Sequence, residues 1–188
     1  VKAITGQDAI AVADPTMLLD AHEWSKVLND SMVPKEKYIL LYVLKESPYI
    51  TETALRIAKE KRLKVVRICR GAYRQDPKNS PIQNIMDAGP AEYLALFKNA
   101  TMVMTNSFHG TVFSIQFNKD FYTIVSRSAN NNSRQIDLLS TLGIDRIKYT
   151  DTTFSEESAI EWEIVNKRVE EYRMESINYL QKAINDEK

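Results

Sequence analysis

The stretch that most constrains the fold is residues 101–126, which reads as a strand, a polar turn, a helix and a second strand. Its first apolar run, 101–104, is short and flanked by turn formers, as expected of a buried parallel strand. Apolar residues then surround most of a helix over 111–117, which predicts a helix buried on most sides. The turn between them, 106–110, contains asparagine, serine, histidine and glycine. In a parallel sheet, ligands bind where a strand ends and a helix begins, and the amides there favour an anion.

The rest of the chain predicts a doubly wound parallel α/β sheet, Rossmann-like and of about five strands, because strands alternate with helices. The most apolar run, residues 38–44, is the best candidate for a central strand. Further strands are expected at 64–69 and 146–149, with a short one at 9–13. Proline at the first helical position indicates helices that begin at Pro48 and Pro90. Ser133 is expected to cap a helix that stops at Gly143, and residues 70–89 are expected to form an irregular loop.

The predicted organisation has three parts. Residues 1–30 are expected to be a connector, the end of a missing N-terminal domain, because the opening is short and the chain begins at Val1. Residues 31–155 are expected to form a Rossmann-like domain. Residues 156–188 are expected to form a long amphipathic helix with a mixed-charge solvent face. Its apolar stripe, 162–184, should be partly exposed or paired with another copy of the chain if a first domain normally covers it.

Composition excludes several classes of protein. The 188 residues contain 25 basic and 25 acidic side chains, so the basic excess of a nucleic-acid binder is missing. One cysteine, Cys69, rules out an intrachain disulfide framework and fits a reducing compartment, here the cytoplasm. Neither a membrane-length apolar run nor a signal-peptide pattern is present. The two histidines, His22 and His109, show no metal-ligand spacing, so no metal site is predicted.

Candidate site residues gather at the predicted carboxyl edge of the sheet. His109 can bind an anion or exchange a proton near neutral pH, although a polar turn histidine is an equal alternative. Asn106 and Ser107 can donate to the same ligand or simply cap the helix, and capping is the simpler interpretation of each. Arg70 and Arg134 each follow a strand at that edge, where a forked guanidinium suits phosphate or carboxylate. Gly-rich dinucleotide and P-loop fingerprints are absent from the sequence.

The run 103–114, which contains Ser107-Phe108-His109-Gly110, resembles the signature of the polysaccharide pyruvyl transferase family. Further pieces that resemble the family follow in the right order, so that the likeness covers most of the chain. They are 14–16 with Leu18 and Leu19, 38–40 with Tyr42, Asp87 with 89–90, 99–100, 118–119 with Phe121, Asn132 with Arg134, Leu138, Leu139, Leu142 and Gly143, and 160–162.

This resemblance implies a GT-B-like enzyme in which two Rossmann-like domains face each other, with the present chain as the C-terminal half. It implies transfer of a pyruvyl group from phosphoenolpyruvate to two hydroxyls of a sugar, as a ketal, in surface or exopolysaccharide biosynthesis. Phosphoenolpyruvate is then a substrate, and no cofactor is expected. The implied partners are a sugar or glycan-lipid acceptor and the missing N-terminal domain, with possible peripheral association with membrane-bound glycan intermediates and no nucleic acid.

By the same resemblance, His109 is the catalytic candidate, Ser107 and Gly110 line the donor pocket, and Arg134 is an anion partner. Arg70 is a candidate from its position alone. One wall of the cleft is expected to be missing, so this chain alone is expected to be inactive. Two alternatives stay open: a GT-B glycosyltransferase that uses a nucleotide sugar, and a non-catalytic module that binds an anion or a protein partner.

Overall fold

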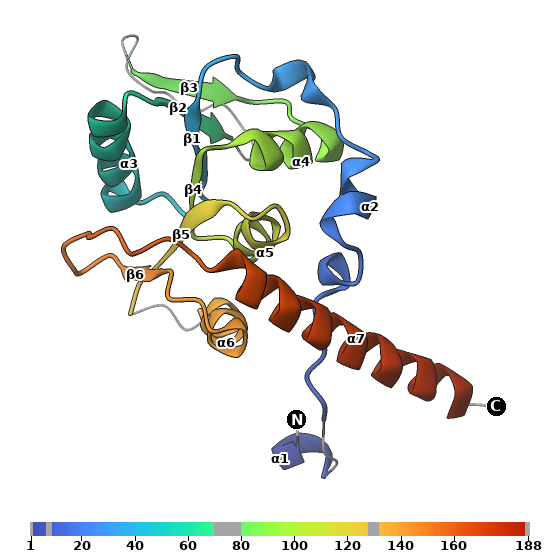
Figure 1. The fold of residues 1–188 in the computed structure, drawn as a ribbon. Coiled ribbons are helices and arrows are strands. Elements are labelled where there is room, and N and C mark those ends of the chain that lie inside the picture. The colour runs from blue at the N-terminus through green and yellow to red at the C-terminus, as the bar shows by residue number, and fades with distance from the viewer. Residues whose placement is uncertain (1, 7–8, 70–79, 128–131, 187–188) are drawn as a thin grey trace.

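The computed structural model describes residues 2–6, 9–69, 80–127 and 132–186 (Figure 1). Its centre is a six-stranded parallel sheet in the order β3-β2-β1-β4-β5-β6. The strands are β1 (Tyr38–Tyr42), β2 (Lys64–Ile68), β3 (Ile82–Ile85), β4 (Met102–Thr105), β5 (Asp120–Val125) and β6 (Ile147–Tyr149). This order is that of a doubly wound α/β fold, so the predicted fold class is confirmed.

Two predicted elements differ from the structure. The irregular loop expected at 70–89 contains β3, which pairs in parallel with β2 from Val65–Ile82 to Ile68–Ile85. Its centre, Gln83 and Asn84, is polar because an edge strand is half exposed, and so it lacks an apolar pattern. The strand expected at 9–13 does not form, since that segment pairs with no strand and Ile10 is 64% exposed.

Helices cover both faces of the sheet. On one face lies α3 (Pro48–Lys61), and on the other lie α4 (Pro90–Asn99), α5 (Phe108–Gln116) and α6 (Ser133–Leu142), which share one apolar cluster (Figure 1). The remaining helices are α1 (Lys2–Thr5), η1 (Pro15–Met17), α2 (Ala21–Ser25), η2 (Asp30–Met32) and α7 (Trp162–Asp186). The helices thereby bury the central strands β1, β4 and β5 on both faces, as is typical of a parallel sheet, whereas the edge strands β3 and β6 are partly exposed.

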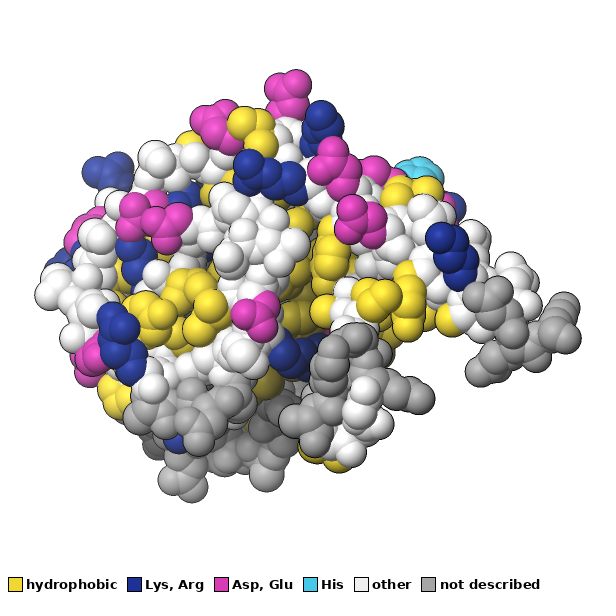
Figure 2. Space-filling view, turned by 90° about the horizontal axis from the view of Figure 1, so that it is seen from below, with side chains coloured by type: hydrophobic (Ala, Val, Ile, Leu, Met, Phe, Trp, Pro, Cys, Tyr) yellow, Lys and Arg dark blue, Asp and Glu magenta, His cyan; other side chains and the backbone are white. Residues whose placement is uncertain are grey.

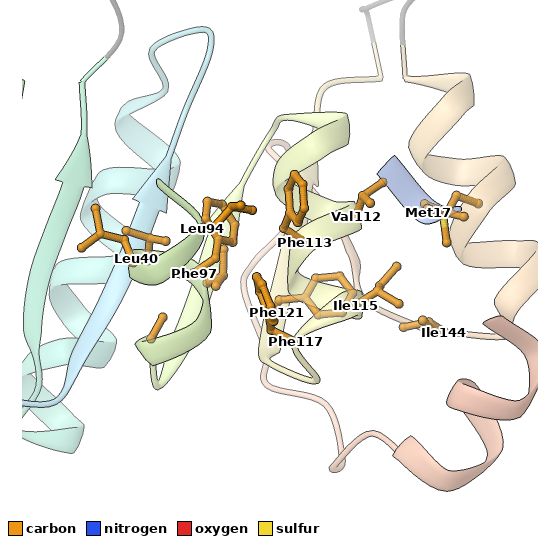
Figure 3. Close-up of a cluster of buried hydrophobic side chains, with 14 of the residues drawn as sticks. Met17, Leu40, Leu94, Phe97, Val112, Phe113, Ile115, Phe117, Phe121 and Ile144 are labelled. Carbon is orange, nitrogen blue, oxygen red and sulfur yellow. The ribbon is translucent and has the colours of Figure 1, made fainter. Parts of the chain in front are cut away.

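Alternation along β1 divides the core into two clusters. Leu40 faces α4 and α5, whereas Ile39 and Leu41 face α3, and all three are fully buried. Figure 3 shows the larger cluster, in which aromatic rings fill the space between the sheet and its helices. Within it, Phe113 stacks on Phe117 with ring centroids 6.3 Å apart. Large aromatic side chains of this kind supply much of the apolar area that stabilises a domain.

Helix ends follow the predicted signals, with one shift. Pro48 and Pro90 occupy the first turns of α3 and α4. Gly143 ends α6 at a φ of 65°, which glycine adopts without strain. The N-cap of α6 is Asn132 rather than the predicted Ser133, and its side chain makes no capping bond but donates to the Ser126 carbonyl at 2.6 Å.

The segment 13–19 is hydrogen-bonded to two helices, α5 and α7. Gln116 on α5 donates to the carbonyls of Thr16 and Leu19 at 3.1 and 2.7 Å. From α7, Arg173 Nε donates to the Met17 carbonyl at 2.7 Å, and Ser176 Oγ accepts from the Ala13 amide at 2.9 Å. With Met17 fully buried between them, this segment has a fixed place beside α5.

Helix α7 is only partly covered by the rest of the chain. Val165 and Val169 are buried against α6, but Ile164, Met174 and Ile184 are 53%, 45% and 66% exposed. Seen from below, the surface of the molecule carries hydrophobic side chains between charged ones (Figure 2). The predicted partial exposure of the apolar stripe is confirmed.

Candidate functional site

The loops after β1 and β4 meet at the point where the strand order reverses, since β1 lies between β2 and β4. Asn106, which follows β4, joins them: its Oδ1 accepts from the Leu44 amide at 2.8 Å, and its Nδ2 donates to the Lys45 carbonyl at 2.7 Å. Thr105 Oγ1 adds a bond to the Tyr42 carbonyl at 2.6 Å. The Asn106 side chain therefore links the loop after β4 to the loop after β1.

We expect Asn106→Ala to lower the free energy of unfolding by about 1–2 kcal/mol, because two backbone groups lose their partner. Urea unfolding of the chain measures this change. Asn166→Ala is the matched control, since Asn166 is exposed on α7 and its loss should stay within about 0.5 kcal/mol. Equal effects of the two substitutions would contradict the bridging role of Asn106.

A cavity of about 380 Å³ opens at this edge, at the carboxyl ends of β1, β4 and β5. Leu44, Ile50 and Ile124 give it an apolar wall, and Lys45 and Asn106 are among its polar lining residues. The N-termini of α3 and α6 both border it, and neither N-cap side chain bonds to its helix. Uncapped first-turn amides and two helix dipoles favour a negatively charged ligand in such a cavity.

The start of α5 is built on a close approach to β4. Ser107 is 2% exposed and caps the helix, because its hydroxyl accepts from the Gly110 amide at 3.3 Å. Gly110 lies directly on Thr105: a Cβ at Gly110 would come within 3.0 Å of the Thr105 Cβ and closer still to its Oγ1. Ser107 and Gly110 are thus buried parts of the turn that fix its shape, whereas the His109 side chain between them is exposed.

His109 and Arg134 meet at a third residue, Asp14. Arg134 Nη2 donates to Asp14 Oδ2 at 2.8 Å, and His109 Nε2 lies 3.7 Å from the same oxygen. The Arg134 guanidinium also stacks on the Phe108 ring, 3.8 Å from its centroid. The side chains of His109 and Arg134 are 51% and 58% exposed, whereas that of Asp14 is 11% exposed. The exposed side chains of Arg134 and His109 therefore lie side by side, both next to the Asp14 carboxylate.

Asp14 is ionised in this setting. Burial acts to raise its pKa, but hydrogen bonds from the Thr16 hydroxyl and amide, with the charges of His109 and Arg134, bring the pKa below its ordinary value. The folded-state pKa lies below the unfolded one, so the ionised carboxylate stabilises the folded protein at neutral pH. That contribution is lost as pH falls through the lowered pKa. The carboxylate charge is therefore permanent at neutral pH.

The structure thus brings together two of the predicted site residues, His109 and Arg134, at the edge of the sheet. Among the others, Asn106 borders the cavity, while Ser107 and Gly110 support the turn from below. Arg70 lies outside the described residues. Neither His109 nor Arg134 lines the described cavity, although Asn132, the N-cap of the helix that carries Arg134, does.

Asp14 and Phe108 are site residues that sequence reasoning did not select. Asp14 carried a usable signal, since an aspartate two residues before a threonine is a turn and cap pattern. Phe108 carried none, because an aromatic residue at a helix start is usually read as core. Its stacking partner Arg134 lies 26 residues further along the chain.

Metal-binding and membrane-spanning features are not found in the part of the chain that the structure describes. Over those residues, no group of three or more His, Cys, Asp or Glu side chains is placed to hold a metal ion. No helix of the described ranges combines the length and the apolar character needed to cross a membrane.

The fold has counterparts among solved structures. The "Glycotransferase of kitacinnamycin" aligns with a TM-score of 0.54 at 15% identity, over 79% of this chain and 42% of that chain, which shows a shared fold. UDP-GlcNAc 2-epimerase from Methanocaldococcus jannaschii aligns at 0.43 and 15%, over 84% and 42% of the two chains. E. coli ADP-heptose lps heptosyltransferase II aligns at 0.42 and 11%, over 84% and 53%. The chain therefore spans about half the length of these proteins or less.

No curated protein matches the chain. A family model does: the model described as polysaccharide pyruvyl transferase matches residues 1–128. The matched part contains Asp14, the loop after β1 and the whole turn 106–110, so it includes most of the edge described above. Arg134 and α7 lie beyond it. The chain belongs to the polysaccharide pyruvyl transferase family.

Proposed function

We propose that this chain is the donor-binding half of a transferase that moves a pyruvyl group from phosphoenolpyruvate to two hydroxyls of a sugar, as a ketal. The observation that carries the proposal is the carboxyl edge of the sheet, where uncapped helix N-termini border a cavity and His109 and Arg134 lie side by side. Family membership supports the same reaction.

The chemistry of the donor fits this edge. Phosphoenolpyruvate carries a phosphate and a carboxylate on the same carbon, so it needs two anion-binding elements a short distance apart. Helix N-termini provide amides and a favourable dipole for one anion. A guanidinium provides parallel donors for the other. Lys45 adds a positive charge at the cavity wall.

The proposed reaction conserves atoms and charge without a redox partner. A proton is added to the methylene carbon of phosphoenolpyruvate, which leaves an oxocarbenium-like centre at the neighbouring carbon. One sugar hydroxyl attacks that centre and loses its proton. The bond to the phosphate oxygen then breaks, and a second hydroxyl takes its place and also loses its proton. Of the two protons lost, one balances the proton on carbon and the other leaves with inorganic phosphate.

His109 is the group of this chain that can serve these proton transfers or hold the departing phosphate. It is exposed at a helix start, next to a guanidinium. Groups placed where charge develops lower the barrier by stabilising that charge, and a histidine can also exchange protons near neutral pH.

The acceptor site belongs to a part of the enzyme outside this chain in the proposed arrangement. A second Rossmann-like half would face the edge, as in a GT-B architecture, and α7 would contact it through its exposed apolar residues. The acceptor would be a sugar or a lipid-linked glycan met at the cytoplasmic side of a membrane during surface polysaccharide biosynthesis. These 188 residues alone should form no ketal, and measurable turnover by them would contradict the two-half arrangement.

Thermal unfolding with phosphoenolpyruvate tests the donor assignment. At a concentration of 100 times the dissociation constant, binding should stabilise the fold by about 2.7 kcal/mol. For a chain of this size that corresponds to a rise in Tm of roughly 5–10 °C. Pyruvate, which lacks the phosphate, should give a much smaller rise.

A matched pair of lysine variants controls this experiment. Lys45→Met removes a cation at the cavity and should reduce the rise in Tm, whereas Lys167→Met removes an exposed cation of α7 and should not. The apolar cavity wall makes a nucleotide sugar the second candidate donor. A rise in Tm with UDP-N-acetylglucosamine but not with phosphoenolpyruvate would replace the proposal, and no response to either would remove it.

A further inference from the structure

One carboxylate, that of Asp14, serves two sets of partners through its two oxygens. Oδ1 accepts hydrogen bonds from the Thr16 amide at 3.1 Å and the Thr16 hydroxyl at 2.7 Å. Oδ2 faces the cations, with Arg134 Nη2 at 2.8 Å and His109 Nε2 at 3.7 Å. Oδ1 therefore fixes the Asp14 side chain, while Oδ2 contacts Arg134 and lies near His109.

Asp14 is also the least exposed of the three charged or ionisable side chains in this group. Its side chain is 11% exposed, and it caps η1 through Thr16. The residues on either side are tied to α7, because Ala13 donates to Ser176 and Met17 accepts from Arg173. A carboxylate held in this way sets the positions of exposed side chains that contact it, rather than following them.

Arg134 is the side chain that gains most from such support. It is 58% exposed, and a long exposed side chain normally samples many rotamers. The Phe108 ring holds the guanidinium plane from one face, and Asp14 holds one of its nitrogens at the edge. Since the bond to Asp14 uses Nη2, the Nε and Nη1 groups stay available for a ligand. The described contacts thus orient the guanidinium and leave its other N–H donors for a ligand.

We propose that Asp14 is a positioning residue of the donor site, whose carboxylate holds Arg134 and His109 side by side so that both act on one anionic donor. This inference rests on the proposed function. It makes the segment 13–17 part of the donor site, through a residue 95 and 120 positions before the two that it orients. Two other roles are conceivable for Asp14, and each predicts a different result. A residue that only caps η1 would leave donor binding unchanged, and one that competes with the donor for Arg134 would weaken it.

The test is a double-mutant cycle on phosphoenolpyruvate binding, measured by calorimetry at pH 7 on the chain as it stands. Asp14→Asn keeps the acceptor for Thr16 and removes the charge, so the dissociation constant should rise about tenfold through loss of orientation. Arg134→Met should raise it at least as much. The double variant should bind only slightly more weakly than Arg134→Met, because Asp14 acts mainly through Arg134, to which it is hydrogen-bonded, and only weakly through His109 at 3.7 Å.

Asp20→Asn is the matched control. Asp20 is also a capping aspartate, which accepts from the Glu23 amide at 2.8 Å, but it lies at α2 and outside the site. Its substitution should change phosphoenolpyruvate binding less than twofold. Tighter binding by Asp14→Asn would overturn the inference in favour of competition, and an unchanged constant in favour of simple capping. Independent effects of Asp14→Asn and Arg134→Met that multiply in the double variant would overturn it as well.

A second readout does not need the donor. The heteronuclear NOE of the Arg134 side-chain Nε–H group should fall in Asp14→Asn and stay unchanged in Asp20→Asn, with the resonance assigned from Arg134→Lys. If the unaltered chain fails to bind phosphoenolpyruvate, the proposed function fails while this NOE still reports on positioning. If the chain binds the donor but the NOE stays unchanged in Asp14→Asn, the inference fails alone. Should Asp14→Asn not fold, Thr16→Val loosens the same carboxylate and should lower the NOE by a smaller amount.

Discussion

Gly110→Ala is expected to lower the free energy of unfolding by about 3 kcal/mol or more, although alanine is normally the better helix former by about 1 kcal/mol. The added Cβ would come within 3.0 Å of the Thr105 Cβ and closer still to Thr105 Oγ1. That hydroxyl cannot turn away freely, because it donates to the Tyr42 carbonyl at 2.6 Å and accepts from the Ser107 amide at 3.0 Å. Relief of the overlap must either break these bonds or lift α5 from β4.

Urea unfolding measures this change, and Gly89→Ala is its matched control. A Cβ at Gly89 would meet only the end of the flexible Glu92 side chain, and the Gly89 φ of −75° suits any residue. The control should therefore stay within about 0.5 kcal/mol of the unaltered chain. A second variant, Gly110→Ala with Thr105→Ala, removes the crowded hydroxyl and should recover part of the loss. A Gly110→Ala protein as stable as the original would show that α5 and β4 are not in close contact.

His109→Gln is expected to lower kcat by about 10²- to 10⁴-fold in the assembled enzyme, the range for loss of a group that transfers a proton or stabilises charge. The same substitution should barely change the stability of the chain, because the His109 side chain is 51% exposed and its approach to Asp14, at 3.7 Å, is too long for a hydrogen bond. Release of inorganic phosphate from phosphoenolpyruvate in the presence of acceptor measures the rate.

The two possible roles of His109 differ in their effect on donor binding. If it mainly holds the phosphate, His109→Gln raises the dissociation constant of phosphoenolpyruvate; if it transfers protons, that constant stays near its original value while kcat falls. His22→Gln is the control, because His22 is the other histidine and lies on α2 away from the site. A His109→Gln enzyme with kcat within threefold of the original would exclude His109 from the chemistry.

Much of the fold follows from local sequence signals. The stretch 101–126 forms the predicted strand, turn, helix and strand, as β4, α5 and β5. Its strands are mostly apolar and are buried on both faces except at Asp120, the first residue of β5, which leaves few alternatives for the backbone. Edge strand β3 was not predicted, because its stability comes from pairing with β2 rather than from its own residues. The strand predicted at 9–13 was wrong for the opposite reason: the segment has strand-forming residues but no neighbouring strand to pair with.

The site is less visible in the sequence than the fold, because its contacts join distant residues. Asp14 and Arg134 are 120 positions apart, and nothing local to either indicates that they meet. Asn106 was predicted as a ligand donor, but its amide and carbonyl are engaged by backbone groups 61 and 62 positions away. Such use of a polar side chain depends on the loop after β1, whose path is set by the whole sheet. His109 was identified because its position at a strand–helix turn is itself a local signal.

The fastening of the segment 13–19 by α7 has a consequence for how the protein is made. Ser176 and Arg173, which hold Ala13 and Met17, are synthesised after every strand of the sheet. Because domains assemble as the chain leaves the ribosome, the sheet can form before α7 is available, while of the two helices only α5, through Gln116, holds the segment that carries Asp14. That segment reaches its final place beside α5 only after α7 has been synthesised. A polypeptide that stops before α7 would already have its strands, but would lack two of the four hydrogen bonds that tie this segment to α5 and α7.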